Sequence, residues 1–181
     1  MQLILIKIFA SMLVVVGLSL IAERLSPKWA GVLGGFPLGT ALVMIFLGIE
    51  QGDVFARQSA LYAIPGVIAN VSMLVLYGFF ALKLKNRSPL YSAALSLLVF
   101  FAVGYPLSLV EFDLLSSILF TASGLAIAHW ACLRLVEVRI TNPVRITFGI
   151  VLIRAGFAAF MVLIISGLAQ SLGPDLSGVL A

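Results

Sequence analysis

Residues 30–49, AGVLGGFPLGTALVMIFLGI, form one apolar block that is interrupted by Gly34, Gly35 and Pro37. The block has the length of a helix that crosses a bilayer, about 20 residues. Glycine adopts backbone conformations closed to other residues, and proline suits the first turn of a helix. The stretch therefore predicts a transmembrane helix broken at Gly34–Pro37, whose second half runs from Pro37 to Ile49.

Five further apolar blocks surround this one. They span approximately residues 2–22, 59–82, 90–110, 114–133 and 146–168. The 181-residue chain is 62% hydrophobic and 10% charged, whereas a soluble domain is about 45–50% apolar and about 25% charged. The blocks show no period-2 alternation of the kind found in barrel strands. We therefore predict an all-α integral membrane protein with six transmembrane helices in a lipid bilayer.

The charged residues between the blocks predict an orientation. If the helices alternate in direction, the loops after the first, third and fifth helices carry eight cations, and the opposite side carries Arg57 alone among acidic residues. The eight are Arg24, Lys28, Lys83, Lys85, Arg87, Arg134, Arg139 and Arg145. The positive-inside rule then predicts that these loops are cytoplasmic and that both termini lie outside. This placement also accounts for the net charge of +4 without a nucleic-acid partner.

The two ends of the chain resemble each other at an offset of 147 in the numbering. Segments 21–33 and 168–180 are identical at six of 13 positions, and the same offset places Lys7 over Arg154. Five predicted helices separate the starts of the two copies, so the copies would enter the membrane in opposite directions. This indicates an inverted-topology repeat. Chance similarity between two Leu-, Ala- and Gly-rich stretches is the alternative.

The repeat predicts a division of the chain into two units. Residues 1–145 would form a first five-helix unit, and residues 146–181 would begin a second, inverted unit. The second copy stops before any equivalent of Phe36-Pro37, so it is expected to be incomplete. Either the chain is a fragment of a longer protein, or a homodimer or partner chain completes the second repeat.

The break in the second helix is the first candidate site. Amide groups exposed at the start of its second half, at the positive end of the helix dipole, favour an anion or a carbonyl group. Transporters place such breaks at their binding sites. Gly34, Gly35, Pro37 and Thr40 are therefore predicted to bind substrate. The same glycines also fit a close helix-packing pattern, so this alternative stays open.

Polar residues within or beside the apolar blocks supply the other candidates. Arg154 lies well inside the last block, where an unpaired cation is costly, and we predict that it binds substrate. Asn70 is predicted to join it as a polar group near the middle of a helix, although structural hydrogen bonding is the alternative. Glu50, Arg57 and Lys7 are predicted to act in gating or ion binding, with Arg57 as the partner of Glu50. The alternatives are that Lys7 reaches the membrane surface and that Glu50 and Arg57 are merely solvated.

Enzyme motifs are absent from the sequence. It contains no Gly-x-x-x-x-Gly-Lys-Ser/Thr phosphate loop, no His-Glu-x-x-His and no Gly-x-Ser-x-Gly, which ATPases, metalloproteases and hydrolases would require. One His and one Cys are too few for a structural zinc site. We therefore expect no catalytic activity, no metal and no cofactor.

A family resemblance begins at residues 26–37, SPKWAGVLGGFP, and continues to Glu50-Gln51-Gly52. Here the chain resembles a group of bacterial inner-membrane proteins that share an Ala-Gly-x-x-x-Gly-aromatic-Pro signature followed by Glu-x-Gly. It is also distantly similar to the GlpM-like small membrane proteins. The resemblance is confined to this part of the chain. It implies a location in the bacterial inner membrane and the activity of a permease, and it names no substrate.

Two functions are compatible with these features. The first is a permease or secondary transporter of a small solute, ion or lipid-linked molecule, which works by alternating access around the helix break. The second is an accessory or assembly subunit of a membrane complex, in which the glycines serve helix packing. A membrane enzyme acting on lipid head groups is disfavoured, because no span carries paired carboxylates.

Overall fold

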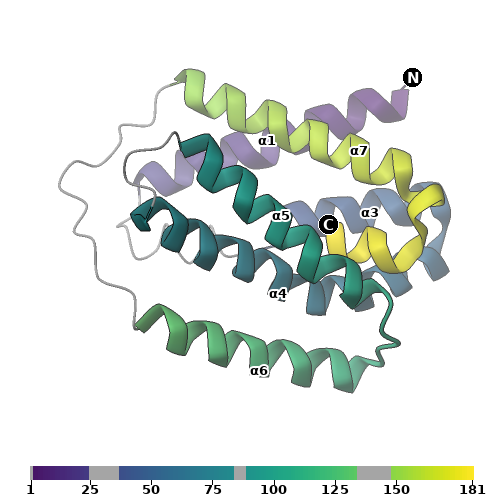
Figure 1. The fold of residues 1–181 in the computed structure, drawn as a ribbon. Helices are drawn as coiled ribbons and strands as arrows, with labels where there is room; N and C mark the ends of the chain where they lie inside the picture. Colours follow the sequence, from purple (N-terminus) through teal and green to yellow (C-terminus); the bar gives the residue numbers. More distant parts are fainter. Residues whose placement is uncertain (1, 25–36, 84–88, 134–147) are drawn as a thin grey trace. The chain divides into compact units, whose positions relative to one another are not determined.

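Helices make up the fold. The computed structural model describes residues 2–24, 37–83, 89–133 and 148–181, and this part of the chain contains six α-helices and no strand (Figure 1). The helices are α1 (Gln2–Arg24), α3 (Leu38–Gln51), α4 (Asp53–Lys83), α5 (Pro89–Ser108), α6 (Leu114–Leu133) and α7 (Phe148–Leu180). The prediction of an all-helical chain is confirmed.

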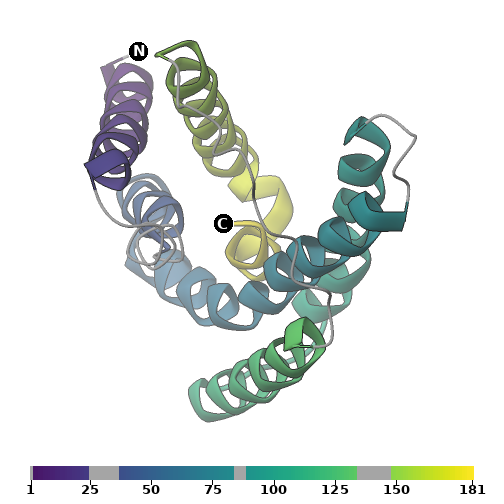
Figure 2. The same cartoon turned by 90° about the vertical axis from the view of Figure 1, so that its left-hand side faces the viewer.

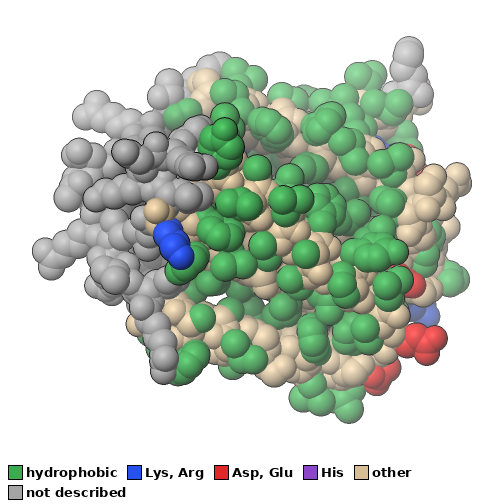
Figure 3. Space-filling view, viewed as in Figure 1, with side chains coloured by type: hydrophobic (Ala, Val, Ile, Leu, Met, Phe, Trp, Pro, Cys, Tyr) green, Lys and Arg blue, Asp and Glu red, His purple; other side chains and the backbone are tan. Residues whose placement is uncertain are grey.

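Five of the six helices in the described residues are long and apolar enough to cross a membrane, and α3 is the exception. Large hydrophobic side chains point outward along them, including Phe9, Ile127 and Phe157, which are 72%, 68% and 63% exposed. Figure 3 shows hydrophobic side chains spread across the coloured part of the face that it draws. An apolar surface of this extent suits a lipid environment, and the fold is consistent with an all-α membrane protein.

Helix α3 begins where the sequence predicts the second half of a broken helix. It starts at Leu38, directly after Pro37, and its 14 residues span about 21 Å, less than the roughly 30 Å of a bilayer core. Gly34 and Gly35 lie outside the described residues. At its other end α3 stops at Gln51. Gly52 follows with a φ of 89°, a conformation that glycine adopts readily, and α4 begins at Asp53.

The last helix is longer than the predicted block, which ends at residue 168. Helix α7 continues to Leu180 with a break at Gly173, where φ is 76° and ψ is 168°. Glycine takes this positive φ without steric cost. Pro174 follows at the first position of the new helical segment, where its missing N–H breaks no hydrogen bond.

The helices belong to two compact units. The described residues of the first unit are 2–56, 148–171 and 181, so it contains α1, α3 and the first part of α7. The second contains residues 57–83, 89–133 and 172–180, which cover most of α4, all of α5 and α6, and the end of α7. The predicted boundary after residue 145 falls among residues that the structure does not describe, and it stays a prediction.

Glycines allow very close helix packing in the second unit. A Cβ atom on Gly66 of α4 would lie 2.9 Å from the backbone oxygen of Val179, near the end of α7. A Cβ atom on Gly178 would collide with the backbone of Ser59. Val179 is almost fully buried there beside Tyr62. The crossing of α4 and the end of α7 therefore depends on residues without side chains.

Candidate functional site

A buried cation marks the candidate site. The side chain of Lys7 is only 4% exposed, although it lies just five residues after the start of α1 at Gln2. The rise of an α-helix places it about 7.5 Å along the helix from that start. A lysine there could have extended to the membrane surface. In the structure it instead points inward, toward α3 and α7.

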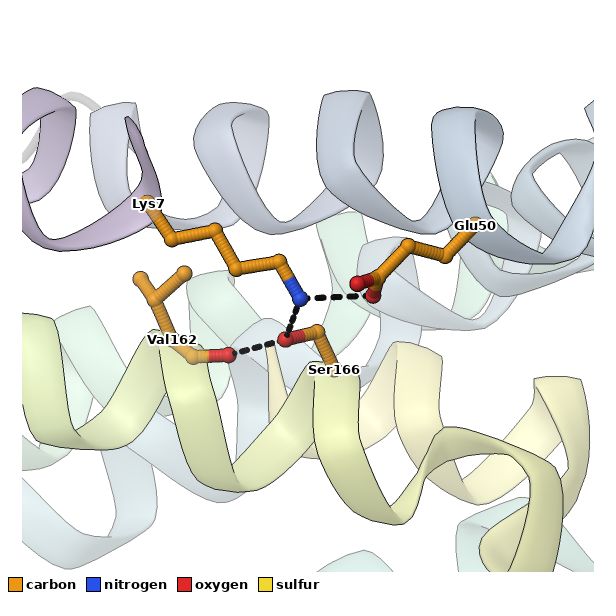
Figure 4. Close-up of polar contacts among 4 residues, drawn as sticks. All are labelled: Lys7, Glu50, Val162 and Ser166. Carbon is orange, nitrogen blue, oxygen red and sulfur yellow. Dashed lines mark hydrogen bonds and ion pairs between the residues drawn. The ribbon is translucent and has the colours of Figure 1, made fainter. Parts of the chain in front are cut away.

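Two oxygen atoms meet the Lys7 ammonium group. Its Nζ donates to Oε2 of Glu50 at 2.6 Å and to Oγ of Ser166 at 2.6 Å (Figure 4). The Ser166 hydroxyl in turn donates to the carbonyl oxygen of Val162 at 2.7 Å. Because the hydroxyl proton of Ser166 is engaged by Val162, the hydroxyl oxygen acts as the acceptor for Lys7. The result is an ion pair with a hydroxyl support, built from α1, α3 and α7.

Helical spacing places each of these groups. On α3, the buried residues Val43, Phe46 and Leu47 precede Glu50 at intervals that keep all four on one face. The Phe46 ring lies 5.7 Å from Lys7 Nζ and offers its face to the cation. On α1, the Ser11 hydroxyl donates to the carbonyl oxygen of Lys7 at 2.7 Å. Glu50 thus lies on the buried, apolar face of α3, where its carboxylate meets the Lys7 ammonium of α1.

The three groups lie near one end of the first unit. Lys7 is in the second turn of α1, Glu50 is one residue before the end of α3, and Ser166 is seven residues before the break at Gly173. Helix α1 runs in the opposite direction to α3 and the first part of α7 (Figure 1). Figure 2 shows the same three helices grouped together. The pair therefore lies within about two helical turns of one end of these helices.

The two charges differ in their access to solvent. The Lys7 side chain is 4% exposed, and the Glu50 side chain is 24% exposed. Burying either charge alone is costly in a protein interior or a bilayer. The ammonium is enclosed by Phe46, Ser166 and the carboxylate, whereas the carboxylate remains partly open. Glu50 is therefore the more exposed member of the pair.

The partner of Glu50 differs from the sequence expectation. The sequence predicts Arg57, seven residues later, as the partner of Glu50, whereas the structure pairs Glu50 with Lys7, 43 residues earlier. The alternatives of a snorkelling Lys7 and a solvated Glu50 do not describe this geometry. Separation along the chain explains the difference, because only the packing of α1 against α3 brings the two charges together.

Two predicted residues of the break region, Pro37 and Thr40, lie within the described part of the first unit. Thr40, in the first turn of α3, donates through Oγ1 to the carbonyl oxygen of Ala181 at 2.8 Å. Pro37 precedes the helix with a φ of −79°, is exposed, and provides no side-chain cap. Gly34 and Gly35 cannot be placed, since they lie outside the described residues.

Of the remaining candidates, Arg154 shares the first unit with the ion pair but lies away from it along α7. Arg154 is an exposed residue of α7 in the first unit and precedes Ser166 on that helix. The rise of an α-helix separates these two residues by about 18 Å along its axis. Asn70 and Arg57 are exposed residues of α4 in the second unit. Within the first unit, the structure therefore brings Lys7 and Glu50 together and leaves Arg154 apart from them.

The contact of Ser166 with Lys7 was not predicted from the sequence. A serine inside an apolar helix commonly donates to the carbonyl oxygen four residues earlier, as Ser166 does to Val162, so it gives little functional signal by itself. Its position opposite Lys7, 159 residues away, is visible only once α1 and α7 are packed. Among the described residues, no group of three or more His, Cys, Asp or Glu side chains could hold a metal ion.

Comparison with known proteins gives no relative. No protein-family model matches the chain, and neither a curated protein nor a solved structure matches it.

Proposed function

We propose that the chain is a membrane permease, or secondary transporter, which moves a small solute, ion or lipid-linked molecule by alternating access. The observation that carries the proposal is the Lys7–Glu50 ion pair among apolar helices. A buried ion pair is weak support for stability, because apolar groups of similar volume often replace it without loss. Ionisable groups inside membrane-spanning segments instead tend to mark the paths of ions and substrates.

The position of the pair supports movement around it. Lys7, Glu50 and Ser166 come from three different helices, so a shift of one helix would separate charges that the others hold. Alternating access requires contacts of this kind, which exist in one arrangement and are replaced in another. An ion pair that can open is therefore suited to a gate.

Discontinuous helices also support a transporter. Helix α3 begins at Leu38, directly after the non-helical Pro37, and α7 breaks at Gly173. The Thr40 hydroxyl near the start of α3 contacts the carbonyl oxygen of Ala181, just after the end of α7. Transporters build their binding sites from such half-helix ends. We propose that Gly34, Gly35, Pro37 and Thr40 line the solute path here.

An inverted-topology repeat is the architecture that we propose for this transporter. At the offset of 147, Pro27 aligns with Pro174 and Lys7 aligns with Arg154. In the proposal, residues 1–145 form the first five-helix unit, and a homodimer or partner chain completes the unit that begins at residue 146. Arg154 and Asn70 act as further solute-binding groups in this arrangement.

We propose that the protein lies in the bacterial inner membrane with its cation-rich loops in the cytoplasm. The distribution of eight cations against one supports this orientation. Because Lys7 is close to the start of α1, the ion pair would then face the side opposite the cytoplasm. Glu50 would act there as an outer gate, with Arg57 on the same side.

An accessory or assembly subunit is the second candidate. The observation that favours it is the crossing of α4 and the end of α7, where Gly66 and Gly178 serve close packing. Small residues at a helix crossing stabilise association without any transport role. Under this function, the Lys7–Glu50 pair would only hold helices together.

Solute flux into proteoliposomes distinguishes the two functions. Purified protein is reconstituted, and light scattering follows swelling after an iso-osmotic exchange into lactate, glutamate, betaine or inorganic phosphate. We expect protein-dependent swelling with at least one solute and its loss in Glu50→Gln. Asp53→Asn, which neutralises an exposed carboxylate three residues later, is the matched control and should retain the flux. Swelling with none of the four solutes would favour the accessory function.

A further inference from the structure

We propose that the Lys7–Glu50 pair is a proton-linked binding site for a monoanion, most suitably a monocarboxylate. A proton that binds Glu50 frees Lys7, and the anion takes the place of the carboxylate. This inference rests on the proposed transport function and identifies its substrate class and coupling ion. It follows from three features of the pair: unequal exposure, the absence of another paired carboxylate side chain among the described residues of the first unit, and the chemistry around the ammonium group.

The exposures decide which partner exchanges. Lys7 is 4% exposed and is held by Ser166 and by the face of the Phe46 ring. Glu50 is 24% exposed and makes no other side-chain hydrogen bond among those found in the described residues. The ammonium is thus a fixed buried charge, while the carboxylate can be approached from outside. Replacement of the carboxylate is therefore the natural route into the site.

No other described carboxylate side chain of the first unit pairs with Lys7. The charged side chains described in the first unit are Lys7, Glu50, Asp53 and Arg154. Asp53 is exposed at the start of α4 and forms no ion pair with Lys7. Arg154 is a cation on α7, about three helical turns before Ser166. If Glu50 becomes neutral, the buried ammonium has no described counter-ion side chain within the first unit, and an anion from solution can take that place.

The exchange is balanced in atoms and charge. In the resting site, the Glu50 carboxylate accepts a hydrogen bond from the Lys7 ammonium at 2.6 Å. One proton adds to a Glu50 oxygen to give a neutral carboxylic acid, and one monoanion accepts the hydrogen bond that Lys7 releases. No covalent bond other than the new O–H bond forms or breaks. The loaded site carries the same net charge as the empty one, so proton and anion bind in a ratio of one to one.

The surroundings select the kind of anion. A single ammonium group is a compact charge that balances one negative charge, which disfavours a dianion. The Ser166 hydroxyl proton is engaged by Val162 and is unavailable to a second anionic oxygen. The Phe46 ring, 5.7 Å from Nζ, provides an apolar neighbour. A carboxylate with a small apolar remainder matches this combination.

Formate is the probe for the test, because it is the smallest monocarboxylate. The thermal midpoint of the purified full chain is titrated with formate at about pH 8 and again at about pH 4.5, where carboxylates ordinarily begin to bind protons. We expect the apparent affinity of the wild type for formate to be about tenfold or more higher at the lower pH. Glu50→Ala, which lacks the internal anion, should bind formate with this higher affinity at both pH values.

Two variants control for general salt effects. Lys7→Met/Glu50→Gln has no buried charge and should show no formate dependence at either pH. Asp53→Asn should behave as the wild type does. Formate binding by the wild type that is independent of pH would overturn the proposal. The same conclusion follows if Glu50→Ala gains no formate dependence, or if the double variant keeps the wild-type response. If Glu50→Ala does not fold, Glu50→Gln provides the same comparison.

The binding test and the flux test can give different outcomes, so the binding site and the transport function can be excluded independently. Swelling of proteoliposomes without proton-linked formate binding would leave the transporter in place and exclude this site as its anion site. Proton-linked formate binding without flux of any of the four solutes would support the site and remove the transport function.

Discussion

Lys7 is stable as a cation among apolar helices because it has oxygen partners on two sides. Glu50 balances its charge, and Ser166 accepts a second hydrogen bond. Other buried polar groups are less well provided for. The hydroxyls of Ser59 and Ser177 are fully buried in the second unit and have no hydrogen-bond partner there. At the residue scale, the buried ammonium of Lys7 therefore has hydrogen-bond partners that these two buried hydroxyls lack.

Removing one charge of the pair should cost more than removing both. Lys7→Met leaves the Glu50 carboxylate without its cation, and we expect a loss of about 2 kcal/mol, discounted from the roughly 3–5 kcal/mol of a fully buried pair because Glu50 is partly exposed. The double variant Lys7→Met/Glu50→Gln should regain most of this loss. Thermal unfolding in detergent measures both. A double variant that is less stable than Lys7→Met would show that the pair is mainly structural.

Asp113 should make the start of α6 sensitive to acid. Hydrogen bonds from the Ser116 side chain and then from the Ser116 backbone N–H lower the pKa of Asp113 below its ordinary value. A lowered pKa means that the ionised carboxylate stabilises the folded helix start above the unfolded pKa of about 3.9. This contribution is lost as the pH falls through the folded pKa.

Amide hydrogen exchange at the first turn of α6 measures this effect. Protection of Ser116, corrected for the intrinsic pH dependence of exchange, should fall below about pH 4 in the wild type. Asp113→Asn keeps a cap that does not titrate, so its protection should stay constant over the same range. Equal pH dependence in the two proteins would exclude Asp113 as the cause.

Breaks at glycine and proline set the lengths of α3 and α7. Helix α3 follows Pro37 and ends at Gly52, while α7 breaks at Gly173, and both of these glycines have positive φ. These backbone geometries create helix ends inside segments that are otherwise apolar. At the element scale, helix ends rather than continuous spans distinguish this fold from a simple bundle.

Gly178 should tolerate no side chain. A Cβ atom there would collide with the backbone of Ser59, and the backbone cannot move aside as a flexible side chain would. We expect Gly178→Ala to cost at least about 2 kcal/mol. Gly167→Ala, on the same helix with no atom within 4 Å of the added Cβ, should be neutral or stabilising by up to about 1 kcal/mol. Equal thermal midpoints for the two variants would contradict the packing of α4 against α7.

The sequence predicted helix starts and apolar extents better than it predicted contacts. Proline lacks an N–H group and has a restricted φ, so the start of α3 after Pro37 could be read locally. The break at Gly173 was missed, because the apolar pattern ends near residue 168 and nothing local required the helix to resume. The pairing of Glu50 with Lys7 was not predicted, since local spacing does not report the packing of α1 on α3.

Charge placement governs how the whole molecule can sit in a bilayer. The helices present large apolar side chains outward, so lipid can cover them without regard to direction. Direction must then come from the loops, where the predicted alternation of six helices would distribute the cations eight to one. The predicted orientation is therefore a property of the whole chain. Labelling at the two ends of a single helix is enough to test it.

Cysteine labelling tests the orientation. In a Cys132→Ser background, Lys83→Cys at the end of α4 and Glu111→Cys between α5 and α6 place single thiols at opposite ends of α5. A membrane-impermeant maleimide added to intact cells should label Glu111→Cys and spare Lys83→Cys until the cells are opened. Labelling of both positions in intact cells, or the reverse pattern, would contradict the predicted orientation.

The most direct test of the account is solute flux through the neutral double variant Lys7→Met/Glu50→Gln. This protein should fold with nearly wild-type stability, since no buried charge is left unpaired, yet it lacks the groups proposed to bind a proton and an anion. We predict that its proteoliposomes swell at the rate of protein-free liposomes in the solute that the wild type moves. Swelling at the wild-type rate would contradict a functional role for the Lys7–Glu50 pair.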